Sequence, residues 1–75
     1  MEIRRVFAEN LKRYRKLAGL SQEDLALNAS VERAYVSLLE RQLNSPTIDM
    51  VSKLSKAVGV EPYELLVPPS KKKRQ

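Results

Sequence analysis

The fold of this chain is decided by residues 21–41, which read SQEDLALNASVERAYVSLLER. Ser21 and Asp24 have the spacing of a capping box, in which each side chain bonds the other residue's backbone amide at the start of a helix. The helix that begins there is short, and a tight connection over residues 29–31 leads to a second short helix over residues 32–41. Helices of a simple bundle run longer, because they must bury one another. The stretch therefore predicts a pair of short helices in which one braces the other.

An amphipathic helix precedes this pair. Apolar residues recur at intervals of three and four from Ile3 to Leu17, which is the period of a helix with one buried face. Gly19 follows these residues, and a glycine at this place is the usual left-handed residue at the end of a helix. The sequence therefore predicts a first helix that ends at Gly19.

Two further helical segments follow the pair. Thr47 is placed to cap a helix that has Ile48 on its inner face and stops at Gly59. Pro62 starts a last short helix that runs through Leu66, since proline is tolerated at the first helical position. Because no strand pattern or internal repeat is visible, the sequence predicts an all-α fold of five helices.

Positive charge is concentrated at the two ends of the chain. The net charge is +5, and residues 71–74 contribute four of those charges, which leaves +1 for residues 1–70. Within that body, residues 1–16 carry +4. We expect residues 1–67 to form one folded domain and residues 68–75 to form a basic disordered tail, because the tail has no apolar periodicity. The tail resembles a nuclear-import signal, but a solvated arm that adds non-specific affinity for nucleic acid fits it better.

The composition excludes several classes of function. Cysteine and histidine are both absent from the 75 residues, which removes disulfides, thiolate chemistry, ordinary zinc sites and the usual general base. No nucleophile–base pair or metal cluster can be assembled, so we expect neither an enzyme nor a cofactor. No apolar run approaches the roughly 18 residues of a membrane span, and the N-terminus lacks the apolar region of a secretory signal. We therefore expect a cytoplasmic protein with no membrane association.

An ordered set of residues covering roughly residues 4–66 matches a known pattern. The set comprises Gly19-Leu20-Ser21-Gln22-Glu23-Asp24-Leu25-Ala26, Val31, Val36-Ser37, Leu39-Glu40-Arg41, Ser45-Pro46-Thr47-Ile48 and Leu54-Ser55-Lys56-Ala57-Val58-Gly59-Val60. It resembles the Cro/cI-type (XRE family) helix-turn-helix DNA-binding proteins. Residues 32–37, with Glu40 and Arg41, more narrowly resemble the controller proteins of restriction–modification systems, although short prophage repressors share these features.

The resemblance implies a lambda-repressor-like fold and a sequence-specific transcription regulator. Such a protein binds double-stranded DNA, with residues 32–41 as the recognition helix in the major groove. One recognition helix contacts few base pairs, so the resemblance also implies a homodimer on an inverted-repeat operator. No small-molecule ligand is evident. The alternative is a helix-turn-helix module that binds protein or acts as an antitoxin.

Four residues of the recognition helix are predicted to contact bases. Arg33 can bond guanine O6 and N7 together, and the alternative is a solvated charge. The resemblance places base contacts at Ala34 and Ser37, which could equally be small residues that permit close approach. Leu38 either contacts a thymine methyl group or covers the end of the preceding helix, and the second interpretation is favoured.

Five residues are predicted to contact DNA phosphates. Gln22 lies in the first turn of its helix, where free amides and the helix dipole suit a phosphate, and the resemblance gives this glutamine a backbone contact. Tyr35 either donates its hydroxyl to a phosphate or packs its ring against the preceding helix. Arg41, Asn44 and Ser45 follow the recognition helix, where the loop of the family contacts phosphates, which fix register without specifying sequence.

The resemblance also implies a structural ion pair between Arg15 and Glu40. Glu40 follows the apolar Leu39, and an unpaired carboxylate beside the core would be unfavourable. This pair is therefore interpreted as holding the recognition helix against the first helix, not as contacting DNA.

Three residues depart from the family pattern. Ser30 stands where glycine is usual in the turn, so its backbone must tolerate the turn conformation or bend it. Glu32 stands at the cap of the recognition helix, where glutamate is a poor cap, so the start of that helix is expected to shift. Gln42 replaces the usual terminating glycine, so the end of the helix is expected to shift toward Asn44.

The last apolar residues of the chain form the candidate dimer surface. This segment is more apolar than the capping of a final helix requires, and the predicted surface consists of Val60, Tyr63, Leu65, Leu66 and Val67. The alternative is that these residues close the core of one chain.

Overall fold

A computed structural model describes residues 2–69, which form four α-helices and one 3-10 helix. The helices are α1 (Ile3–Leu17), α2 (Gln22–Ala29), α3 (Arg33–Glu40), α4 (Ile48–Val58) and η1 (Pro62–Leu66). No strand is present in residues 2–69, which confirms the all-helical class. The count of five helices is not confirmed as α-helices: four are observed, and the last predicted helix is a 3-10 helix of 5 residues. Most of the predicted tail, residues 70–75, lies outside the described residues.

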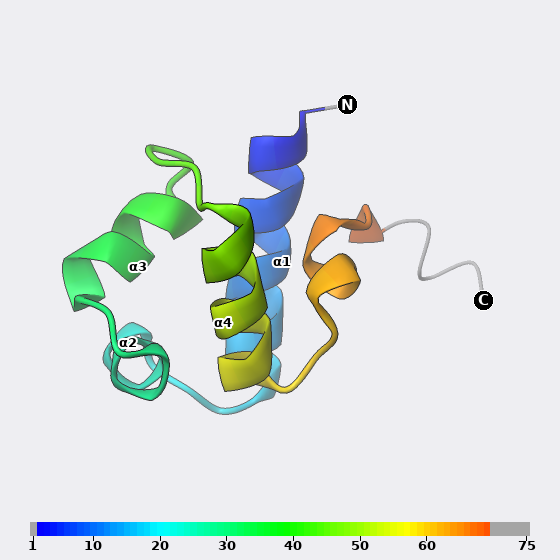
Figure 1. Ribbon diagram of the computed structural model, residues 1–75. Coiled ribbons are helices and arrows are strands. Elements are labelled where there is room, and N and C mark those ends of the chain that lie inside the picture. The colour runs from blue at the N-terminus through cyan, green and yellow to red at the C-terminus, as the bar shows by residue number, and fades with distance from the viewer. Residues whose placement is uncertain (1, 70–75) are drawn as a thin grey trace.

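The helices surround one core (Figure 1). Helices α1 and α4 pack together at the centre of the view, α2 and α3 lie on one side of them, and η1 lies on the other side. Helix α1 contacts α3, α4 and η1, while α2 packs on α3 and α4. No helix in the described part of the chain is long and apolar enough to cross a bilayer.

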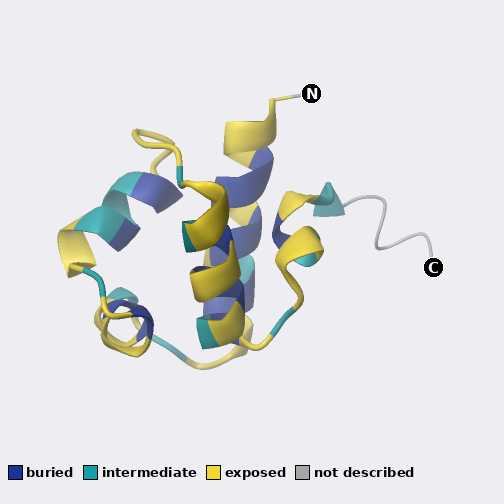
Figure 2. Ribbon diagram, viewed as in Figure 1, coloured by how far each residue is buried: buried dark blue, intermediate teal, exposed yellow. Residues whose placement is uncertain are grey.

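The buried faces of the helices meet in this core (Figure 2). Its fully buried large side chains include Phe7, Leu11, Leu25, Val36, Leu39, Leu54 and Leu65. The predicted apolar stripe of α1 is buried in its middle but not at its ends, since Ile3 and Leu17 are 51% and 73% exposed. Ile48 was expected on the inner face of α4 and is 87% exposed. It is the first residue of α4 and lies before the buried stripe that Val51 begins.

Two helices begin with the caps that the sequence predicts. The Ser21 hydroxyl accepts from the Asp24 amide at 3.0 Å, and an Asp24 carboxylate oxygen accepts from the Ser21 amide at 3.1 Å. The Thr47 hydroxyl accepts from the Met50 amide at 3.0 Å at the start of α4. At the start of α3, Glu32 makes no side-chain cap, and the helix spans Arg33–Glu40 instead of the predicted residues 32–41.

A residue in the left-handed conformation follows each of the four α-helices, one or two positions after its last residue. These residues are Gly19, Ser30, Gln42 and Gly59, with φ of 75°, 58°, 65° and 82°. Ser30 therefore takes the turn conformation that glycine usually supplies. The expected shift of the end of α3 toward Asn44 does not occur, because Gln42 itself takes the left-handed conformation.

Backbone hydrogen bonds hold Gln42 in this conformation. The Leu43 amide donates to the Leu38 carbonyl at 2.9 Å, and the Gln42 amide donates to the Leu39 carbonyl at 3.1 Å. This is the Schellman arrangement, which satisfies the free carbonyls at the end of a helix. The hydrogen bonds offset the unfavourable φ, so the helix ends where glycine would have ended it.

A buried asparagine joins η1 and the residue after it to α1. Asn10 is 0% exposed, and its side-chain nitrogen donates to the carbonyls of Leu65 at 3.0 Å and Val67 at 2.8 Å. Its oxygen accepts from Arg13 Nη2 at 3.4 Å. A buried amide with all of these partners is stabilising, whereas one without them would be unfavourable. Asn10 thus fixes η1 and the residues after it against α1.

Candidate nucleic-acid interface

The outward face of α3 carries the predicted base contacts. Arg33 and Ala34 are exposed in the first turn, and Ser37 is half-buried one turn later. Positions four apart share a helix face, so Arg33, Ser37 and Arg41 follow one side of the helix. Arg41 Nε donates to Ser37 Oγ at 3.3 Å. The face is therefore small and polar, with an arginine at each end.

The opposite face of α3 is buried in the core. Val36 and Leu39 are both 0% exposed. Tyr35 and Leu38 lie between the two faces and are half-buried, and the Tyr35 ring packs against the core. This packing does not decide between the two interpretations of Tyr35, and the phosphate contact of its hydroxyl stays a prediction.

Arg15 and Glu40 form a paired contact between α1 and the last residue of α3. Arg15 Nε lies 2.6 Å from Glu40 Oε2, and Arg15 Nη2 donates to Glu40 Oε1 at 3.0 Å. Both side chains are nearly buried, with 10% and 2% exposure. Arg15 Nη1 also donates to the Leu20 carbonyl at 2.9 Å. The two-bond geometry fixes the orientation of both partners, so α3 is held at a set position relative to α1.

Gln22 takes part in the same contact. It is the first residue of α2, it is half-buried, and its Nε2 donates to Glu40 Oε1 at 3.1 Å. One N–H of the Gln22 side-chain nitrogen is thus committed to the protein. Its second N–H and the first backbone amides of α2 are the donors that remain for a phosphate. The sequence did not predict this bond, which joins α2 to the end of α3.

The connection after α3 places the other predicted phosphate contacts at the surface. Arg41, Asn44 and Ser45 are all exposed. Asn44 Oδ1 accepts from the Ser45 amide at 2.8 Å, which orders the turn. Ser45 Oγ accepts from Arg4 Nε at 2.9 Å. Sequence reasoning missed Arg4, because no local pattern relates the first turn of α1 to a loop 41 positions away.

The residues of the predicted dimer surface differ in their exposure to solvent. Tyr63 and Leu66 are 65% and 40% exposed, and Val60 and Val67 are half-buried. Leu65 was included in that surface, but it is 0% exposed and packs in the core of the single chain. The inclusion of Leu65 is therefore wrong, because consecutive residues of η1 point in different directions.

An apolar groove adjoins this surface. It has a volume of about 210 Å³ and is lined by Ile3, Arg4, Phe7, Ser45, Pro46, Ile48, Val51 and Leu66. The lining residues come from the start of α1, the connection after α3, the start of α4 and η1. Three large apolar side chains at the groove, those of Ile3, Ile48 and Leu66, are exposed to solvent.

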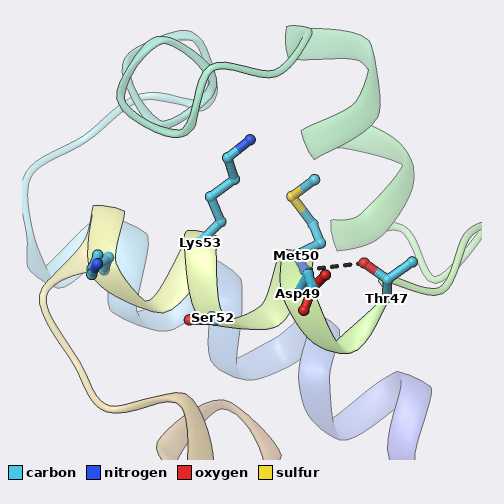
Figure 3. Close-up of a pocket in the computed structure, with 6 residues that line it drawn as sticks. Thr47, Asp49, Met50, Ser52 and Lys53 are labelled. Carbon is cyan, nitrogen blue, oxygen red and sulfur yellow. Dashed lines mark hydrogen bonds between the residues drawn. The ribbon is translucent and has the colours of Figure 1, made fainter.

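A second hollow lies on α4 (Figure 3). It is lined by Thr47, Asp49, Met50, Ser52, Lys53 and Lys56. The side chains of Met50 and Lys53 extend from α4 toward α2 and α3, and the Met50 amide bonds the Thr47 hydroxyl. Within residues 2–69, no group of three or more acidic, histidine or cysteine side chains is placed to hold a metal ion.

Comparison with known proteins identifies the family. Residues 11–65 match the family described as Helix-turn-helix. The chain is 37% identical over 65 residues to Control protein C.BamHI of Bacillus amyloliquefaciens, covering 85% of this chain and 80% of that protein.

Two solved structures have the same fold. The hypothetical transcription factor NHTF from Neisseria has a TM-score of 0.94 and 36% identity, covering 97% of this chain and 84% of that chain. The Restriction-Modification Controller Protein C.Esp1396I, as a tetramer in complex with its natural 35 base-pair operator, has a TM-score of 0.80 and 28% identity, covering 88% of this chain and 91% of that chain. The family match spans most of the chain. The chain therefore belongs to the helix-turn-helix family of DNA-binding transcription regulators.

Proposed function

We propose that this protein binds a specific inverted-repeat operator as a homodimer, with α3 of each subunit in the major groove. One observation carries the proposal. The outward face of α3 is polar and open around Arg33, while its inner face is buried and its last residue is fixed to α1 through the Arg15–Glu40 pair. A recognition helix needs both an accessible face and a fixed orientation, because base contacts depend on register.

In this proposal, Arg33 is the principal base contact. It is exposed at the first position of α3, and the N-terminal residues of a recognition helix are the ones that reach base edges. Its guanidinium would bond O6 and N7 of one guanine. Ala34 and Ser37, on the same face, would approach a thymine methyl group and a base edge. Leu38 is half-buried at the edge of that face, so its share in base contact would be small.

Phosphate contacts would flank α3 on both sides. Gln22 and the first amides of α2 would bind one phosphate, and Arg41, Asn44 and Ser45 would bind others. The exposure of the last three residues supports this assignment. These contacts would set the register of α3 in the groove and add affinity that falls as salt rises.

The homodimer would form through η1 and the apolar groove. Tyr63 and Leu66 remain exposed beside the groove, and Ile48 and Ile3 add apolar surface to it. A two-fold interface uses the same patch on both subunits, so the exposed Ile48 of one subunit could pack against the groove of the other. The groove includes Ser45 and Pro46, which follow α3, so this contact would bring the two recognition helices together.

The likeness to controller proteins supports a regulator of that kind. C.BamHI is named a control protein, and C.Esp1396I is described as a tetramer on its operator. We propose that this chain acts in the same way, by operator binding without a catalytic step.

Selection of bound sequences from random duplex DNA tests the proposal. The wild-type protein is expected to enrich an inverted repeat whose half-sites are about one helical turn apart. Enrichment of no sequence would contradict the proposal and favour a protein-interaction or antitoxin-type module.

A further inference from the structure

The first turn of α1 lies against the connection after α3. Arg4 Nε donates to Ser45 Oγ at 2.9 Å, and both side chains are at the surface. Figure 1 shows the N-terminal end of α1 and this connection at the same end of the molecule. A guanidinium from the far end of the sequence is thus part of the surface next to the recognition helix.

Arg4 takes part in no ion pair with the residues that the structure describes, 2–69. The ion pairs of this part of the chain join Arg5 to Glu9 and Arg15 to Glu40. The bond to Ser45 uses the single N–H of Nε, and a guanidinium has four further N–H groups on its two Nη atoms. These Nη groups form the fork that matches two phosphate oxygens.

We propose that Arg4 binds a phosphate of the operator backbone together with Ser45. The inference rests on the proposed function, in which Ser45 contacts a phosphate beside the major groove. The Arg4 guanidinium is hydrogen-bonded to the hydroxyl of Ser45, so a phosphate that binds one of these groups is within reach of the other. The bond also orients Arg4 before DNA arrives, which reduces the side-chain entropy lost on binding.

Neighbouring arginines provide matched controls. Arg5 is the next residue of α1, is exposed, and lies 3.9 Å from Glu9 in an exposed ion pair. Replacing it removes the same charge from the same turn of helix, without touching Ser45. Arg4→Lys keeps the charge of Arg4 but removes the planar fork and the Nε bond. Comparison of these variants separates a direct phosphate contact from a general change in charge.

The test measures affinity for the selected operator as a function of salt, using fluorescence anisotropy with a labelled duplex. For Arg4→Gln we expect weaker binding and a decrease of about 0.9 per subunit in the slope of log K against log salt concentration. The loss should be equal on all single-base-pair variants of the operator, since a phosphate contact carries no sequence information. Arg5→Gln should keep nearly the wild-type slope, and Arg4→Lys should keep the slope with intermediate affinity.

Two results would overturn the inference. One is a wild-type slope for Arg4→Gln, and the other is an equal decrease for Arg5→Gln. Arg4 also lines the apolar groove, so sedimentation of Arg4→Gln is measured in parallel. A shift to monomer with an unchanged slope would assign Arg4 to the dimer contact and reject the phosphate contact.

The failure of this inference is distinguishable from failure of the proposed function. If the wild type enriches an operator and Arg4→Gln keeps the slope, the phosphate contact of Arg4 alone is rejected. If the wild type enriches no sequence, the proposed function is rejected and this inference with it.

Discussion

Arg15 on α1 and Glu40 at the end of α3 form two hydrogen bonds, at 2.6 Å and 3.0 Å, in a nearly buried contact. Gln22 at the start of α2 donates to the same carboxylate at 3.1 Å. One carboxylate therefore joins three helices at the point where α3 ends. The contact fixes the end of α3 relative to α1 and α2.

Replacing Glu40 should destabilise the protein strongly. Glu40→Ala leaves the buried Arg15 without its partner, and breaking a buried pair in this way costs about 3–5 kcal/mol. Urea denaturation followed by circular dichroism measures the change in the free energy of unfolding. Glu9→Ala is the matched control, because its pair with Arg5 is exposed and such pairs contribute about 0–1 kcal/mol. Equal unfolding curves for Glu40→Ala and the wild type would show that the pair does not hold α3.

Asn10 should stabilise the protein by holding Leu65 and Val67 against α1. Asn10→Ala removes the donor that satisfies the carbonyls of Leu65 and Val67, and a buried unsatisfied group costs about 1–3 kcal/mol. Thermal unfolding should show a lower Tm for this variant. Asn28→Ala, on the exposed side of α2, should change the free energy of unfolding by less than about 0.5 kcal/mol. A similar small effect for both variants would reject the role of Asn10.

Gln42 should be replaceable by glycine with a gain in stability. Its φ of 65° is a conformation that an L-residue adopts at a cost of roughly 1–2 kcal/mol, and glycine avoids this cost while losing about 0.5–1 kcal/mol in chain entropy. Gln42→Gly should therefore raise Tm by a few degrees. Gly59→Ala should lower Tm, because alanine is strained at a φ of 82°. The added methyl group would have no atom within 4 Å to pack against, so no new contact would offset this strain. A lower Tm for Gln42→Gly would contradict this account.

Local rules predicted the helix boundaries well where one residue decides the outcome. The caps at Ser21 and Thr47 and the left-handed glycine at Gly19 follow from the sequence within a few positions of each feature. The position at which α3 ends was harder to predict, because Gln42 has no intrinsic preference for positive φ. Backbone hydrogen bonds at the end of the helix decided its conformation.

Contacts between distant segments could not be predicted by such rules. The bond between Arg4 and Ser45 joins residues 41 positions apart, and the Gln22–Glu40 bond depends on the angle between two helices. Asn10 did carry a signal, since it is a polar residue within the buried stripe of α1. No signal in the sequence indicated that Ile48 is exposed, because periodicity gives the direction of a side chain but not whether another element covers it.

The apolar groove should control dimer formation. Ile48 is 87% exposed in the single chain, so Ile48→Asp should leave the stability of the monomer nearly unchanged while placing a charge in the proposed interface. Sedimentation at micromolar concentration should show a dimer for the wild type and a monomer for this variant. Leu27→Asp is the control, because Leu27 is 73% exposed on α2 and does not line the groove. A dimer for both variants would place the interface elsewhere, and a wild-type monomer would reject the dimer.

Base contact by Arg33 is the central claim, and titration of the selected operator and its single-base-pair variants tests it most directly. The wild type should discriminate against substitution of one guanine–cytosine pair in each half-site. Arg33→Ala should lose that discrimination, with a loss in affinity of about 1–3 kcal/mol, and should keep its preference at the other positions. If Arg33→Ala weakens binding equally on every variant, or leaves the preference unchanged, then Arg33 does not specify a base and the account is contradicted.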